Sequence, residues 1–201
     1  MRAIVIHSAG DLRIDEMPEE SPSEGEVLVE LRAGGICGSD LHYFNDGGFG
    51  AIRLQQPMIL GHEVAGTITD VGPGVDGLSC GDQVAVNPSR PCGKCLYCRK
   101  AQFNHCLDMR FYGSAMRMPH IHGAFRERLV AKADQCFPIA AGASMQEAAM
   151  AEPLAVTLHA VRLAGSISGQ RVLITGCGPI GALCVIACRL HGAGEITVTD
   201  I

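Results

Sequence analysis

Four cysteines lie close together in the middle of the chain, at a spacing that constrains how that segment can fold. Cys92, Cys95 and Cys98 are each separated by two residues, and Cys106 follows after seven more. The apolar pattern of the flanking sequence stops between residues 90 and 106, so something other than a hydrophobic core must hold this loop. Four thiolates at such spacings can converge tetrahedrally, and zinc is the metal that fits them best.

Two other interpretations of these cysteines compete with a zinc site. Reduced cysteines buried in a core are one, and the ligand-like spacing weighs against it. A zinc finger that reads nucleic acid is the other, but no basic recognition helix follows and the net charge is -5. Because four thiolates leave no open position on the metal, we expect the site to be structural rather than catalytic.

The composition favours a folded, cytoplasmic protein. Of the 201 residues, 47% are hydrophobic and 18% are charged, a balance that fills a core. Residues 1–10 contain no charged leader followed by a long apolar region, so we expect the 10 cysteines to be reduced. No stretch approaches the ~20 uninterrupted apolar residues of a membrane span. We therefore expect a small-molecule ligand, and neither nucleic acid nor a membrane as partner.

The pattern of residues changes near Met150, which predicts two domains, 1–150 and 151–201. Before this point the chain reads as short strands separated by Gly, Pro or acidic turns. After it, helical and β-branched segments alternate, as in a β-α-β unit. The predicted strands are 2–7, 11–16, 27–32, 64–71, 171–175 and 195–199, and the main predicted helices are 152–164 and 182–190.

A second group of residues suggests an open metal site. Cys37 lies in a glycine-rich segment, and His62 and Glu63 follow Gly61. Each signal is weak alone, since a single Cys or His is more often an interior residue. Thiolate, imidazole and carboxylate together give three ligands and leave a fourth position for water or a substrate oxygen. Glu152 is a further carboxylate, although at a helix start its ordinary role is capping.

A glycine-rich turn between a strand and a helix is typical of dinucleotide binding. Glycines let the backbone approach a pyrophosphate, and a helix N-terminus attracts its charge. Asp200 ends the next strand, where an acidic residue binds the adenosine ribose and repels a 2′-phosphate, so we expect NAD, with NADP possible. An ordinary tight turn is the alternative. The turn residues are Gly176, Gly178, Pro179, Ile180 and Gly181.

Taken together, these motifs make the chain similar to the zinc-dependent medium-chain alcohol and polyol dehydrogenases. The Glu152 motif resembles the polyol (sorbitol) dehydrogenase branch, where Glu replaces a second cysteine. Segments 35–43, 87–95 and 108–116 carry the closest likeness. The resemblance implies a mixed α/β fold, with a GroES-like β-barrel catalytic domain followed by the start of a Rossmann cofactor domain.

The resemblance also implies roles for individual residues and two zinc ions per chain. Cys37, His62, Glu63 and Glu152 would surround the catalytic zinc, and which glutamate binds directly stays open. Ser39 would hydrogen-bond the substrate hydroxyl and His42 would pass its proton towards solvent, although both can instead cap a helix at 39–44. Tyr43 resembles a substrate-lining residue, with core packing as the alternative. The implied reaction transfers a hydride from a secondary hydroxyl of a sugar acid or polyol to NAD(P).

A sugar acid carries a carboxylate, and one short segment offers cations that suit it. We predict a contact from Arg110 or Arg117, because a guanidinium can bind both carboxylate oxygens. His120 and His122 add to the cationic potential of this segment. The alternative is that these are solvated surface charges.

The sequence departs from the family at its end. It stops at Ile201, after the second predicted Rossmann strand, whereas the family continues. We therefore expect a truncated chain, with the family's activity belonging to the complete one. A zinc-binding fragment without activity is the rival interpretation, and threonine dehydrogenase is a further rival within the family. A homo-oligomer is expected for the full-length protein, by analogy alone.

Overall fold

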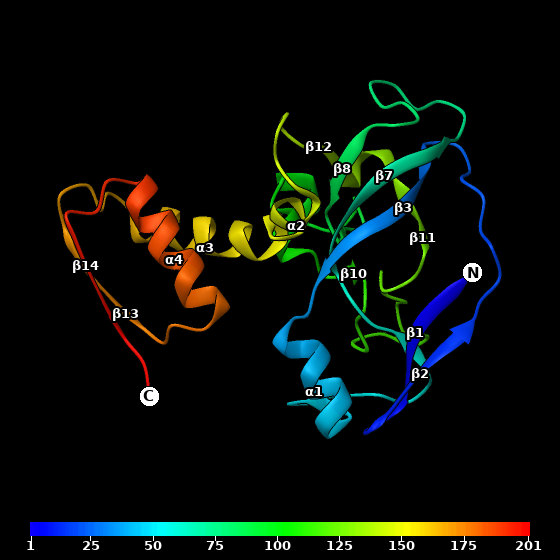
Figure 1. The fold of residues 1–201 in the computed structure, drawn as a ribbon, viewed down its shortest axis with the longest axis horizontal. Helices are drawn as coiled ribbons and strands as arrows, with labels where there is room; N and C mark the ends of the chain where they lie inside the picture. The colour runs from blue at the N-terminus through cyan, green and yellow to red at the C-terminus, as the bar shows by residue number, and fades with distance from the viewer. The chain divides into compact units, whose positions relative to one another are not determined.

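The computed structural model describes residues 1–201, and these divide into two compact units, 1–149 and 150–201. The sequence places the boundary one residue later, between the predicted domains 1–150 and 151–201. Each unit has its own hydrophobic core. Figure 1 shows the helices and strands of both units. None of the helices has the length and apolar character needed to cross a membrane.

The first unit is built mainly from antiparallel strands. A five-stranded sheet has the order β11-β3-β7-β8-β12, and a three-stranded sheet has the order β2-β1-β6. Two short hairpins, β4 with β5 and β9 with β10, complete the pairing. The strands are β1 (Arg2–Ser8), β2 (Asp11–Glu16), β3 (Glu26–Gly35), β4 (Gly48–Phe49), β5 (Ile52–Arg53), β6 (Met58–Ile59), β7 (Glu63–Val71), β8 (Gln83–Val86), β9 (Ser89–Arg90), β10 (Arg110–Phe111), β11 (Arg128–Lys132) and β12 (Cys136–Pro138).

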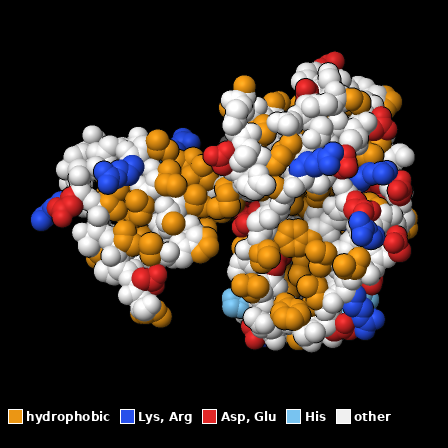
Figure 2. Space-filling view, viewed as in Figure 1, with side chains coloured by type: hydrophobic (Ala, Val, Ile, Leu, Met, Phe, Trp, Pro, Cys, Tyr) orange, Lys and Arg blue, Asp and Glu red, His pale blue; other side chains and the backbone are white.

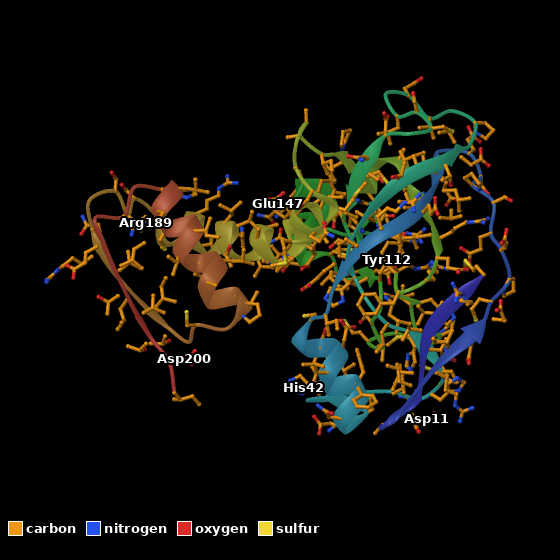
Figure 3. All side chains as sticks on the ribbon, in the orientation of Figure 1. Asp11, His42, Tyr112, Glu147, Arg189 and Asp200 are labelled. Carbon is orange, nitrogen blue, oxygen red and sulfur yellow. The ribbon has the colours of Figure 1, made fainter.

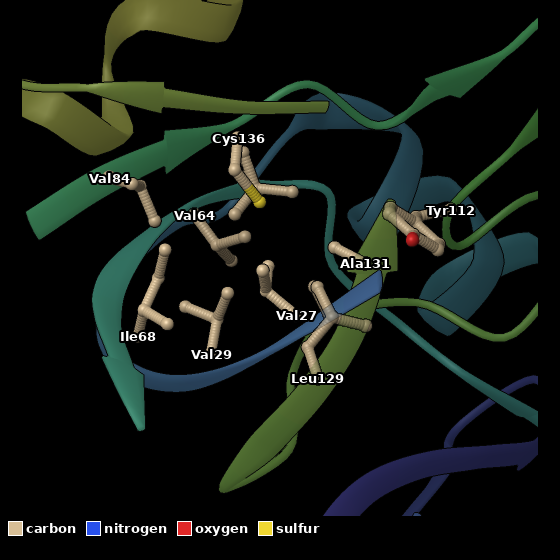
Figure 4. Close-up of a cluster of buried hydrophobic side chains, with 11 residues drawn as sticks. Val27, Val29, Val64, Ile68, Val84, Tyr112, Leu129, Ala131 and Cys136 are labelled. Carbon is tan, nitrogen blue, oxygen red and sulfur yellow. The ribbon is translucent and has the colours of Figure 1, made fainter. Parts of the chain in front are cut away.

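The core of this unit lies on one face of the five-stranded sheet. Val27 and Val29 alternate with more exposed residues along β3, as expected of a strand with one buried face. They pack with Ile68 of β7 and Leu129 of β11, all at most 1% exposed (Figure 4). Burial of these β-branched and leucine side chains holds the sheet together, and so fixes the ends of its strands.

Short helical segments connect the strands. α1 (Gly38–Asp46) follows β3, and α2 (Met145–Ala149) packs its alanines against β3, β7 and β8. The four-cysteine loop contains the 3-10 turns η1 (Cys98–Lys100) and η2 (Phe103–His105), and η3 (Ala133–Gln135) precedes β12. The loop therefore has little regular structure of its own, in agreement with the break in apolar pattern.

The second unit is a parallel β-α-β element preceded by a helix. β13 (Arg171–Thr175) pairs in parallel with β14 (Glu195–Thr199), and α4 (Pro179–Leu190) connects them. α3 (Ala151–Ala164) packs against α4 through a core that includes Val161 and Ala187. This is the arrangement with which a doubly wound cofactor domain begins.

Most of the predicted elements are present, with differences at their ends. The strands at 11–16, 171–175 and 195–199 have the predicted bounds, and β3 runs three residues further than predicted, to Gly35. The prediction that the last helix begins at residue 182 was wrong, because α4 begins at Pro179. Proline fits the first turn of a helix, where its missing N–H has no partner to lose.

The second unit also exposes several large apolar side chains. Leu163 of α3, Leu173 of β13 and Leu190 of α4 are 64% to 73% exposed. Apolar side chains are visible over the surface of this unit (Figure 2). Parallel sheets are normally covered on both faces, so two strands with helices on one face leave apolar surface uncovered.

We expect replacement of a core isoleucine to destabilise the first unit much more than replacement of a surface one. Ile68→Ala removes a side chain that is 1% exposed, whereas Ile14→Ala removes one that is 71% exposed in β2. Ile68→Ala should lower the free energy of unfolding by about 2–5 kcal/mol, whereas Ile14→Ala should change it by less than about 0.5 kcal/mol. Urea unfolding followed by circular dichroism measures both, and equal losses would contradict this assignment of the core.

Candidate metal centres and cofactor turn

The four predicted cysteines of the loop converge in the structure. The sulfur atoms of Cys92, Cys95, Cys98 and Cys106 all lie within 4.8 Å of one another, and none forms a disulfide. The sulfurs of Cys92 and Cys98 are 4.0 Å apart. Sulfurs placed about 2.3 Å from zinc at tetrahedral angles would be about 3.8 Å apart, so the cluster is close to the size that this ion requires.

Backbone amides around the loop donate hydrogen bonds to the sulfurs and so affect how easily the thiols ionise. The N–H groups of Cys92 and Asp108 donate to the sulfur of Cys106 at 3.2 and 3.4 Å. Amide donors from Cys98 and Leu107 lower the pKa of Cys95 to about 6. Burial, by contrast, raises the pKa of Cys98 to about 12. The cluster alone therefore ionises only partly at neutral pH, and binding of a divalent cation would release the remaining protons.

The second predicted cluster is assembled by the pairing of β3 with β7. Gly35, the last residue of β3, lies opposite Glu63, the first residue of β7. Cys37 follows β3 by two residues and His62 immediately precedes β7, so the two segments meet at one end of the sheet. The ligand atoms of Cys37, His62 and Glu63 lie within 4.8 Å of one another.

Glycine and aromatic side chains shape this second cluster. A Cβ atom on Gly35 would collide with the Glu63 carboxylate, so only glycine leaves room for it. The ring of His62 packs against Phe111, with centroids 5.3 Å apart. His62 and Glu63 are 5% and 7% exposed. Ionisable side chains are rarely buried to this extent unless a hydrogen-bond partner, an opposite charge or a metal compensates them.

Asp40 holds the two segments together, and the sequence analysis did not identify it. Its carboxylate accepts the N–H of Cys37 at 3.0 Å and the N–H of Gly61 at 3.1 Å. The side chain is nearly completely buried, at 3% exposure. Asp40 is the third residue after the N-cap of α1, a capping position, but the N-cap is Cys37 rather than serine or threonine, so the signal in the sequence was weak.

The electrostatics of the second cluster suit a metal ion. Hydrogen bonding to His62, and then to Ser39, lowers the pKa of the Cys37 thiol. Burial raises the pKa of Glu63. One thiol that ionises easily and one carboxylate that is costly to bury as an anion both gain from a nearby cation. Three ligands of sulfur, nitrogen and oxygen leave a fourth position open on zinc.

Glu152 is the one predicted ligand that belongs to the second unit. It is the second residue of α3, with Pro153 after it. Its participation in the Cys37 cluster stays a prediction.

The three residues predicted to act on the substrate, Ser39, His42 and Tyr43, all lie on α1. Ser39 hydrogen-bonds the thiol of Cys37. His42 is exposed, and its Nδ1 lies 3.2 Å from Asp46 (Figure 3). Tyr43 is 1% exposed and packs with Phe49 in a core cluster. Its hydroxyl accepts the N–H of Ala115, which supports the packing alternative, and the substrate-lining role for Tyr43 stays a prediction.

The predicted cationic segment is largely engaged within the protein. Arg117 pairs with Asp108 and donates to the carbonyl of Met109. His120 accepts the N–H of Gln55 and donates to the carbonyl of Arg117, while His122 accepts the N–H of Ile59. These contacts stabilise loops and leave Arg117 and His120 poorly placed to bind an external carboxylate. Arg110 is exposed on β10, and its substrate contact stays a prediction.

The glycine turn has the geometry that its sequence predicts. Gly176 has a φ of 90°, which favours glycine, and a Cβ on Gly181 would collide with the carbonyl of Gly176. Gly178 is the N-cap of α4, and Pro179 and Ile180 start that helix. Asp200 accepts the N–H of Cys177 at 3.1 Å, which places its carboxylate beside the turn.

Removing one sulfur from the loop should remove its metal. In Cys98→Ser we expect about one zinc equivalent per chain to be lost and the first unit to become less stable, because metal binding and folding of such loops are coupled. Cys80→Ser is the control, since Cys80 is exposed and outside both clusters. Zinc analysis and urea unfolding test this, and equal zinc content in the two variants would contradict it.

Asp40→Asn should weaken metal binding at the second cluster only. Each carboxylate oxygen of Asp40 accepts one backbone N–H, whereas asparagine has only one acceptor oxygen. The variant therefore loses one of the two hydrogen bonds that join the Cys37 and Gly61 segments. We expect zinc affinity there to fall about 10- to 100-fold. Titration with a chelator measures this, with the four-cysteine zinc as internal reference. Asp46→Asn, at an exposed position of the same helix, should leave both affinities unchanged.

Comparisons with known proteins agree with this geometry. Residues 23–141 match the alcohol dehydrogenase GroES-like domain. L-idonate 5-dehydrogenase (NAD(P)(+)) of Escherichia coli (strain K12) is 47% identical over 175 residues, which cover 87% of this chain and 50% of that protein. Sorbitol dehydrogenase of Bacillus subtilis (strain 168) is 39% identical over 201 residues, 100% of this chain and 56% of that protein.

The fold is similar to solved structures as well. The crystal structure of L-idonate 5-dehydrogenase from Escherichia coli K-12 has a TM-score of 0.94 and 42% identity, and the match covers 100% of this chain and 57% of that one. The chain thus spans about half the length of these relatives. Because the family match covers more than half of its residues, the chain belongs to the zinc-dependent medium-chain dehydrogenases, through their GroES-like domain.

Proposed function

We propose that these residues form the catalytic domain and the start of the cofactor domain of an NAD(P)-dependent oxidoreductase that acts on a secondary hydroxyl of a sugar acid. The observation that carries this proposal is the Cys37, His62 and Glu63 cluster, with Ser39 hydrogen-bonded beside it. A structural metal site needs no open position and no hydroxyl group next to it. Zinc, when bound at such a site, makes a hydroxyl more acidic.

The residues of the chain would then handle the proton of the substrate. Ser39 is hydrogen-bonded to the Cys37 thiol, and its Oγ would accept a hydrogen bond from the substrate hydroxyl. His42, three residues further along α1, is exposed to solvent and carries the proton outwards. His62 and Glu63 are 5% and 7% exposed, so little water reaches these two residues, which strengthens the electrostatic interactions that they make.

The second unit would hold the dinucleotide. Gly176 and Gly178 leave the backbone of the turn open, and the N-terminus of α4 offers unpaired N–H groups to a pyrophosphate. Asp200 lies at the end of β14, close enough to the turn to hydrogen-bond it, where it would bind a ribose hydroxyl. Its charge favours NAD, and the name of the Escherichia coli relative allows both NAD and NADP.

L-idonate is the substrate that the resemblance favours, with oxidation at C5 to 5-ketogluconate. The 47% identity to an L-idonate 5-dehydrogenase supports this choice over the 39% identity to a sorbitol dehydrogenase. Sorbitol, xylitol and L-threonine are the alternative substrates. Arg110, exposed on β10, is the candidate for the carboxylate that a polyol lacks.

A zinc-binding module without hydride transfer is the second candidate function. Its support is that the seven clustered ligand residues, Cys37, His62, Glu63 and the four loop cysteines, all lie in the first unit, so the two clusters themselves need no residue of the second unit. In that case zinc would bind at both clusters while no substrate reduces the cofactor.

The experiment measures NAD reduction with L-idonate, sorbitol and L-threonine on protein of known mass and zinc content. We expect turnover to be fastest with L-idonate. Ser39→Ala should lower kcat on the order of 10²-fold with the zinc content unchanged, because it removes the proton acceptor and not a ligand. Ser8→Ala, at an exposed strand end, is the matched control. Zinc-loaded protein with no turnover on any of the three substrates would favour the binding module.

A further inference from the structure

A pocket of about 370 Å³ in the first unit lies apart from both metal clusters. None of its lining residues belongs to either cluster. Arg126 is the central feature, because its side chain is only 7% exposed. Arginine is almost never buried to this extent without partners that satisfy its charge and its five N–H donors.

Arg126 has few such partners. Its Nε is buried and forms no hydrogen bond. One guanidinium nitrogen donates to Glu20 at 3.3 Å, a long distance for an ion pair. Glu20 is 51% exposed and lies between β2 and β3, outside any helix or strand. The buried cation is thus held by a single, weakly placed carboxylate that solvent can reach.

Other groups in the pocket add donors. Arg90 also lines the pocket, and its charge and that of Arg126 both act on the Tyr112 hydroxyl, whose pKa is raised by burial. His122 accepts the N–H of Ile59 at Nδ1, so the proton of the neutral ring lies on Nε2. Burial and then Arg126 lower the pKa of His122, which keeps the ring neutral and Nε2–H a donor at neutral pH.

The charges of the pocket balance only while Glu20 occupies it. Arg90, Arg126, Glu20 and Glu26 all line the pocket, and Glu26 already accepts the N–H of Ser23. If Glu20 turns to solvent, the lining keeps two cations and one anion. The place that its carboxylate leaves is then attractive to a small anion with several acceptor oxygens.

We propose that this pocket is a binding site for a small oxyanion, a carboxylate or a phosphate, and that Glu20 occupies the site as an internal competitor when no such anion is bound. The ligand would take the guanidinium of Arg126 as its main partner, with Arg90 and the Nε2–H of His122 as further donors. The site contains no residue of either metal cluster and is independent of the proposed function.

The test is calorimetric titration of the zinc-loaded protein with inorganic phosphate and, separately, with acetate, at constant ionic strength. We expect saturable binding of at least one of the two anions, and the comparison identifies which oxyanion the site prefers. Arg126→Gln should weaken binding at least about tenfold, the loss typical of a charged hydrogen-bond partner. Arg128→Gln is the matched control, because Arg128 pairs with the adjacent Glu19 on the surface and lies outside the pocket.

Glu20→Gln is the sharper variant, since Glu20 is exposed and its replacement should not disturb folding. Removing the internal competitor should tighten binding about three- to tenfold, whereas a merely structural ion pair would give no such gain. The proposal is overturned if neither anion binds to wild type or to Glu20→Gln. It is equally overturned if Arg126→Gln and Arg128→Gln bind alike, or if binding disappears only when zinc is removed.

Discussion

The pairing of β3 with β7 is the constraint on which the rest of the first unit depends. It places Gly35 opposite Glu63, and so brings the segment after one strand next to the segment before the other. Asp40 then joins these segments by accepting one backbone N–H from each. A slip of one residue would turn Glu63 to the opposite face of the sheet, so the register and the site are specified by the same contacts. Core burial of Val29 and Ile68 enforces that register.

The two metal clusters show why one was easier to predict than the other. The four cysteines of the loop lie within 15 residues of sequence, so their spacing alone predicts that the sulfurs can meet. Cys37 and His62 are separated in sequence by α1, β4, β5 and β6. No local sequence pattern therefore predicts that their side chains lie close together. Residue chemistry suggested the group, and resemblance to a family strengthened it. The sheet register provides the physical reason, and register is a property of the whole fold.

The roles of several side chains were hard to predict for a common reason, which is that sequence identifies a side chain but not its partners. Tyr43 stands in a segment rich in functional residues, yet the helical period turns it into the core while Ser39 hydrogen-bonds the Cys37 thiol. Arg117 pairs with Asp108, nine residues earlier, and no local pattern predicts that contact. Asp40 was not predicted because its place three residues after the N-cap Cys37 is a weak signal and its second partner, Gly61, is distant in sequence.

The contrast between the clusters extends to how each depends on metal. The cysteine loop contains only short 3-10 turns, and most of its residues other than Cys98 are exposed or half-buried, so without a cation backbone hydrogen bonds are its main internal contacts. Metal binding there would supply folding free energy directly. The Cys37 cluster is instead fixed by a buried sheet and by Asp40, whose contacts involve no metal. Its ligands are therefore positioned in advance, which is what a site needs if the metal must keep one position open for a substrate.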